Sequence, residues 1–329
     1  MTTPDPVGIL RPMFEGLTDA DFEAYAPKKW KSNVYNRERL DVKQKLLALG
    51  RTLATGVTAA DGSPLTLESS AEHPAQWNHK QVEAQHVFLS RNELGRKELD
   101  AIMARGQSIA SLLDDPTPQR NHLFLALTVA HDRAEAALKL HPDARVDREN
   151  LARRCEDHFE REKLLALLHA MPAQFQIGLT TGALVPAATV ADGALCELIA
   201  ALAAPSPPAL PGTPQRLLYV GCAFPRAEAV AAGPGFLDVA RAAMEALLPI
   251  YRFIAWSRDN DFVSIRDTLE KEKQVKRQRG LSPKDEVRIV RGVLAGQIGL
   301  VQEIDARGGL RVLVGKLAVK VGADDVEKR

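Results

Sequence analysis

The chain has 329 residues, enough for two or three domains, and its 45% hydrophobic and 26% charged residues are typical of a soluble globular protein. No run of eighteen apolar residues predicts a membrane span, and the N-terminus lacks the pattern of a secretory signal. The three cysteines form no C-x-x-C pair, which argues against a zinc ribbon or a disulfide framework. We therefore expect a cytoplasmic protein with no metal site and no small-molecule cofactor.

The first predicted elements are two helices. Asp19 is a suitable cap for a short helix over residues 21–25, and Pro27 ends that helix. From Asn36 onward the apolar residues follow helical spacing as far as Gly50, which is expected to terminate the second helix as a C-cap.

The middle of the chain predicts a strand, a helix and a hairpin. Residues 84–90 have the composition of a strand, and residues 93–112 have the spacing of an amphipathic helix. The apolar runs 121–128 and 133–140 flank a short polar turn, which predicts a β-hairpin.

Asp147 or its neighbour is then expected to cap one long charged helix over residues 148–170. The remaining predicted elements are a strand over 175–179, a helix over 191–204, a strand over 216–224 and a helix over 234–256. Because strands and helices mix without regular βαβ alternation, we predict an α+β domain over residues 10–257, built as a mixed or antiparallel sheet with flanking helices. A charged helical connector over residues 258–283 should follow.

The end of the chain has a second strand-rich pattern. Apolar residues alternate through Val287 and Ile289 and again through Ile298, Leu300 and Ile304, as expected of half-buried strands. Two further strands are predicted over residues 310–315 and 317–321. Three glycines crowd the connection between the first two strands and permit a sharp turn: Gly292, Gly296 and Gly299.

The run D-E-V-R-I-V-R-G-x-x-A-G-Q-I-G-x-V-x-x-I-D in this segment resembles a KOW motif, the small SH3-like β-barrel of NusG-type transcription factors and several ribosomal proteins. The resemblance covers residues 284–327. It implies binding to RNA, DNA, the ribosome or RNA polymerase, without deciding among them. A barrel that serves only as a protein–protein interaction module is the alternative.

Charge is distributed unevenly along the chain. From Tyr251 onward there are 17 Lys and Arg against 12 Asp and Glu, whereas the rest of the chain carries 26 against 30. A basic end favours a polyanionic partner. The predicted nucleic-acid contacts of this end are Lys276, Arg277, Arg279, Arg288 and Arg291.

A second basic segment near the N-terminus has interleaved aromatic residues, which together can hold a phosphate backbone and stack bases. Its candidate residues are Lys28, Lys29, Trp30, Lys31, Arg37 and Arg39. The structural alternative is that Trp30 and Tyr35 anchor the helix to the core while the lysines remain solvated. A further polar cluster, residues 76–81 with Arg91 and Asn92, is a weaker candidate.

Catalytic motifs are scarce. Neither G-x-S-x-G nor H-E-x-x-H is present, and Cys222, at the end of a predicted strand, has the apolar neighbours of an inert buried thiol. The large domain also resembles the uncharacterised YktB-type domain at Asp21-Phe22, Leu49-Gly50 and 175–179, which implies an α+β fold and no chemistry.

The sequence therefore favours a non-enzymatic protein that binds nucleic acid, the ribosome or RNA polymerase. A nuclease or nucleic-acid-modifying enzyme, with its active site in the N-terminal domain, is the alternative.

Overall fold

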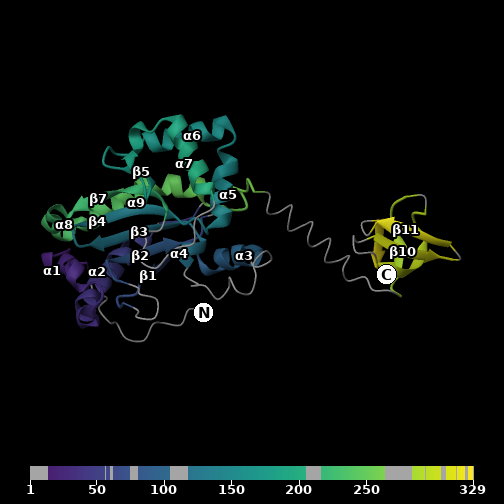
Figure 1. Cartoon of the computed structure of the whole chain (residues 1–329), viewed down its shortest axis with the longest axis horizontal. Coiled ribbons are helices and arrows are strands. Elements are labelled where there is room, and N and C mark those ends of the chain that lie inside the picture. The colour runs from purple at the N-terminus through teal and green to yellow at the C-terminus, as the bar shows by residue number, and fades with distance from the viewer. Residues whose placement is uncertain are drawn as a thin grey trace. The chain divides into compact units, whose positions relative to one another are not determined.

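The computed structural model describes residues 14–55, 57–59, 62–74, 81–103, 118–204, 216–263, 284–292, 294–304, 309–315, 317–322 and 325–328 (Figure 1). Internal contacts divide the chain into two compact units, Met1–Val263 and Ser264–Arg329, here called the large unit and the small unit. Among the described helices, none has both the length and the apolar composition needed to cross a membrane.

The large unit is built on a seven-stranded sheet in which every described strand pair is antiparallel. In sheet order the strands are β1 (Thr66–Ser69), β2 (Ala84–Ser90), β3 (Phe124–Ala130), β4 (Arg133–Leu140), β7 (Leu218–Pro225), β5 (Gln176–Leu179) and β6 (Val185–Pro186). The predicted α+β class with an antiparallel sheet is confirmed, as are the strand at 84–90 and the hairpin formed by β3 and β4.

Helices cover one face of this sheet. The α-helices are α1 (Asp19–Glu23), α2 (Asn36–Ala54), α3 (Glu93–Met103), α4 (Pro118–Asn121), α5 (Arg145–Arg154), α6 (His158–His169), α7 (Asp192–Ala203), α8 (Arg226–Ala232) and α9 (Phe236–Ile254). Short 3-10 turns are η1 (Pro27–Lys29), η2 (Asn33–Tyr35), η4 (Ala187–Thr189) and η5 (Gly233–Gly235). Helix α2 packs on β1 and β2, α9 packs on β3, β4 and β7, and α5 and α6 pack in turn on α9.

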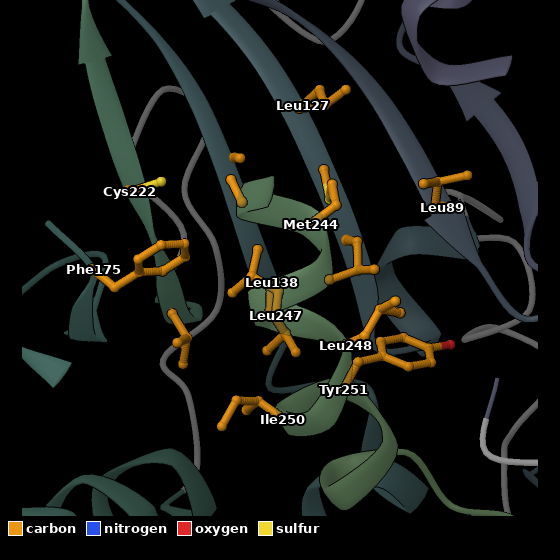
Figure 2. Close-up of a cluster of buried hydrophobic side chains, with 14 of the residues drawn as sticks. Leu89, Leu127, Leu138, Phe175, Cys222, Met244, Leu247, Leu248, Ile250 and Tyr251 are labelled. Atoms are coloured by element: carbon orange, nitrogen blue, oxygen red, sulfur yellow. The ribbon is translucent and has the colours of Figure 1, made fainter. Parts of the chain in front are cut away.

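The core lies between α9 and the sheet. Met244, Leu247 and Tyr251 of α9 point at the strands and meet Leu127 and Leu138, and all five are buried (Figure 2). Fully burying one large apolar side chain contributes about 1.5–3 kcal/mol. Because alternate residues of a strand point to opposite faces, the residues between these core positions point away from α9.

Two predicted helix ends are wrong. Helix α2 continues past Gly50 to Ala54, and a Cβ at position 50 would lie 2.7 Å from Leu67 Cδ1. Gly50 therefore serves close packing of the helix on β1, not termination. The N-cap of α1 is Thr18 instead of Asp19, since Asp21 Oδ2 accepts bonds from both the backbone N–H and the hydroxyl of Thr18, at 2.7 and 2.9 Å.

One predicted helix is divided, and another starts later than predicted. The stretch 148–170 forms α5 and α6 because Asp157 caps the second helix, its Oδ1 accepting the Phe159 N–H at 2.8 Å. Asp147 does not cap the first helix, whose N-cap is Ala144, but lies inside α5 as a buried residue. The stretch 234–256 is preceded by α8, and α9 then starts at Phe236. The predicted helix over 93–112 is described as far as Met103.

The segment after α9 belongs to the large unit as far as Val263. Asn260 Nδ2 donates to the carbonyls of Ala255 and Phe253 at 2.8 and 3.0 Å, and Asn150 Oδ1 accepts the Phe262 N–H at 2.9 Å. The first residues of the expected connector are thus packed, and residues 264–283 lie outside the described ranges.

The small unit is a five-stranded antiparallel sheet. In sheet order its strands are β11 (Leu317–Gly322), β10 (Gly309–Val314), β9 (Ile298–Ile304), β8 (Glu286–Ile289) and β12 (Val326–Lys328). Strand β12, which the sequence analysis missed, adds Val326 to a small core with Val287, Ile289, Val301 and Val312.

The predicted orientation of β9 is wrong. Ile298 and Leu300 are 42% and 45% exposed, whereas Gly299 and Val301 are buried. A Cβ on Gly299 would lie 2.5 Å from Val312 Cγ1, so this side of the strand has room only for glycine there. The apolar alternation of β9 therefore places two of its large residues on the outer face of the sheet.

Candidate nucleic-acid interface

The face of the large sheet that points away from α9 carries a polar row across three strands. His86 of β2 is opposite Thr128 of β3, and Thr128 is opposite Glu135 of β4. Their sequence neighbours, such as Val87 and Leu127, belong to the core, so the three polar residues point to the other face. An open groove of about 630 Å³ lies here and is lined by Trp30, His86, Thr128, His131, Glu135 and Lys139, among others.

The polar groups of the groove are paired with one another. His86 Nδ1 lies 2.9 Å from Thr128 Oγ1, and Lys139 Nζ donates to Glu135 Oε1 at 2.6 Å. The Lys139 ammonium also lies 5.8 Å from the centre of the Tyr219 ring. Burial, with the charge of Glu135 nearby, raises the pKa of Tyr219 above its usual range, so the phenol stays protonated. The groove thus offers donors, acceptors and two cations, Lys139 and Arg133, each held beside a carboxylate.

Trp30 joins the N-terminal basic segment to this groove. Its Nε1 donates to the Tyr25 carbonyl at 2.7 Å, and its carbonyl accepts the Val82 N–H at 3.1 Å. These bonds hold η1 and η2 beside residues 81–84, which also line the groove. The ring is half-buried. Trp30 therefore anchors this loop and also lines the groove, where a ligand can reach it.

The basic residues around Trp30 divide into exposed and engaged groups. Lys28, Lys31 and Arg37 are exposed. Lys29 forms an ion pair with Glu38 at 2.5 Å and lies 4.8 Å from the centre of the Tyr35 ring. Three of the five cations among the predicted residues, Lys28, Lys31 and Arg37, are therefore exposed where a phosphate backbone could reach them.

Arg39 is not a surface contact. It is completely buried, and its guanidinium donates to the carbonyls of Lys29 and Ser32 at 2.5 and 3.1 Å and to Asn36 Oδ1 at 3.2 Å. The irregular chain before α2 turns these acceptors inward, and Arg39 satisfies them. Its role is to hold the loop that carries Trp30.

In the small unit the predicted contacts Arg288 and Arg291 are exposed, whereas Lys276, Arg277 and Arg279 lie outside the described residues. Gly292 and Gly296 both have φ of +88°, the left-handed region that glycine favours. The Gly296 N–H donates to the Ile289 carbonyl at 2.7 Å and closes the turn between β8 and β9. Gly299 has a different role, described above: close contact with β10.

The remaining sequence candidates contribute little to this interface. Cys222 is in the core, and burial raises its pKa to about 12, which suits an inert thiol. Of the polar cluster at 76–81, only Gln81 is described, and it lines the groove. Within the described parts of the chain, no group of three His, Cys, Asp or Glu residues is placed to hold a metal ion.

Sequence reasoning missed the groove residues on β2 and β4. The available signal was the alternation within strands that were correctly located: His86, Thr128, Glu135 and Lys139 are polar and mostly have apolar neighbours in sequence. Gln85, beside His86, is the exception. No protein-family model matches the chain, and no curated protein matches it.

Proposed function

We propose that this protein binds single-stranded RNA without catalysis, and that the groove of the large unit is its principal binding surface. The observation that carries the proposal is the position of Trp30: it lines the groove, and exposed Lys28 and Lys31 flank it in sequence. Single strands are bound by cationic tracks combined with rings on which bases stack. His86 supplies a second ring, and the volume of about 630 Å³ lies within the range of ligand pockets, about 300–1,000 Å³.

The small unit is proposed to supply a second contact as a KOW-type barrel. The motif, the left-handed Gly292 and Gly296 and the exposed Arg288 and Arg291 support this assignment. A ribosome-bound or polymerase-bound RNA is the ligand that would engage both units. DNA is the competing ligand in the binding experiment below.

The test is fluorescence anisotropy with a labelled single-stranded RNA over a range of salt concentrations. We expect Lys28→Ala, Lys31→Ala and Arg37→Ala, combined, to flatten the slope of log K against log salt by about 2, since each single-strand contact contributes about 0.7. The matched control removes three exposed cations outside the groove, Arg145, Lys163 and Arg241. Equal slopes for the two triple variants would refute the proposal, as would equal affinity for duplex DNA and for the single strand.

The two groove histidines favour one second candidate, a metal-independent ribonuclease. One imidazole, His86 or His131, would take the proton of a ribose 2′-hydroxyl as its oxygen attacks phosphorus. The other would protonate the departing 5′-oxygen, and Lys139 would stabilise the charged phosphorane. The P–O5′ bond breaks as the P–O2′ bond forms, which leaves a 2′,3′-cyclic phosphate. Incubating labelled RNA with the protein in a chelator decides this candidate: cyclic-phosphate ends that disappear with His86→Ala support it, and intact RNA excludes it.

A further inference from the structure

A second, smaller cavity lies in the large unit, where the end of β2 meets α3 and the segment that follows α9. Its volume is about 210 Å³, and its walls include Arg91, Asn92, Gly95, Trp256, Ser257 and Arg258. It shares no lining residue with the groove. One water occupies about 30 Å³ of liquid, so the cavity has room for a small ligand.

Three residues that line this cavity have a buried polar atom without a partner in the described part of the chain. Arg91 and Trp256 are 8% and 5% exposed, and among the described residues Arg91 Nε and Trp256 Nε1 form no hydrogen bond. Ser257 Oγ is buried and lacks a partner in the same way. Leaving a buried donor unsatisfied is unfavourable, and native proteins satisfy about nine-tenths of such groups. Three such groups around one cavity indicate a missing acceptor.

The rest of the Arg91 side chain is already fixed. Its two terminal nitrogens donate to the Trp256 carbonyl and to Asp147, which orients the guanidinium. Nε is the one guanidinium nitrogen that has no hydrogen-bond partner among the described residues. Nε of arginine and Nε1 of tryptophan can only donate. The partner they lack must therefore be an acceptor.

Two further features favour an anion. Helix α3 begins at this cavity: Asn92 Oδ1 accepts the Gly95 N–H at 2.9 Å, and the N-terminal end of a helix is electropositive. Arg258 adds a cation to the wall, and Asp259, which is exposed, is the acidic residue of the lining.

We propose that this cavity binds a small phosphate-type oxyanion, either free phosphate or the phosphate monoester of a nucleotide. The oxyanion would accept hydrogen bonds from Trp256 Nε1, Arg91 Nε and the Ser257 hydroxyl. Sequence analysis singled out Arg91 and Asn92 as candidates, but not Trp256 or Ser257, which come from the other end of the unit. The site is independent of RNA binding in the groove.

The direct test follows the indole N–H resonances of the ¹⁵N-labelled full-length protein. The chain has three tryptophans, and Trp256→Phe assigns the Trp256 signal. Titration with inorganic phosphate should move the Trp256 resonance saturably. The Trp30 resonance should stay, because its N–H already bonds to the Tyr25 carbonyl. A Trp256 signal that does not respond to phosphate or to adenosine monophosphate would overturn the proposal.

Calorimetric titration measures the contribution of each donor. Loss of one hydrogen bond to a charged acceptor should weaken phosphate binding about tenfold or more, so we expect that effect from Trp256→Phe and from Ser257→Ala. Ser69→Ala on β1, which is outside the lining, is the control. Saturable binding of adenosine monophosphate but not of inorganic phosphate would identify a nucleotide ligand. Saturable binding of the two compounds alike would identify the phosphate group itself as the ligand. Unchanged affinity in both Trp256→Phe and Ser257→Ala would refute the assignment, provided that thermal unfolding shows folded variants.

Discussion

Asp147 links three parts of the large unit and gives the sharpest stability prediction. Its carboxylate accepts the Leu123 N–H at 2.9 Å and the Trp256 N–H at 2.8 Å, and it also pairs with Arg91. Asp147 is completely buried and Arg91 nearly so. One side chain on α5 therefore ties the start of β3 to the end of β2 and to the segment after α9.

Asp147→Asn keeps the shape but removes the charge that balances Arg91 and one of the acceptors. Removing one partner of a buried ion pair costs about 3–5 kcal/mol, a large share of the 5–15 kcal/mol that stabilises a typical domain. With a urea dependence of about 1–3 kcal/mol per molar, the unfolding midpoint should fall by at least about 1 M. Urea titration followed by circular dichroism measures it.

The matched control is Asp143→Asn, because Asp143 also pairs with an arginine, Arg120, at 2.5 Å, but both side chains are more than one-third exposed. Exposed pairs contribute about 0–1 kcal/mol, so the control should unfold near the parent. If Asp147→Asn and Asp143→Asn differ by less than about 1 kcal/mol, the assignment of Asp147 as the link between these segments is wrong.

Further predictions concern the small unit and pH. Gly299→Ala should destabilise the small unit by about 1–3 kcal/mol through overpacking against β10, measured as faster amide hydrogen exchange in β9, whereas Gln302→Ala, exposed on the same strand, should not. Gly296→Ala should destabilise the small unit by about 1–2 kcal/mol because the backbone at this position has a left-handed φ, and Gly296→Asn should destabilise it less. Equal rates of amide hydrogen exchange in the two variants would show that the left-handed φ is not the cause. Burial lowers the pKa of His141 below 6.5, so the unfolded chain binds this proton more readily, and the free energy of unfolding should fall as pH drops below 6.5. His141→Asn should remove that part of the pH dependence, and an unchanged profile would show that other groups cause it.

Local patterns determined much of the secondary structure. Alternation and turn residues located the strand at 84–90 and the hairpin of β3 and β4, because the period of side-chain exposure depends only on the backbone type. The exposed basic residues beside Trp30 were found in the same way, from residue type and order. Helix ends were less predictable, since Gly50 has two possible uses and only its contact with Leu67 shows which one applies.

Tertiary structure decided which residues meet. The groove combines Trp30 with His86 and Lys139, three segments far apart in the chain. The pairing register of β2, β3 and β4 places His86 and Lys139 on one face, and the Val82 N–H bond to the Trp30 carbonyl adds Trp30. The burial of Arg39 and the exposure of Leu300 have the same origin. A side chain's own chemistry fixes what it can bind, but the surrounding chain decides whether a backbone carbonyl, a neighbouring strand or solvent lies within its reach.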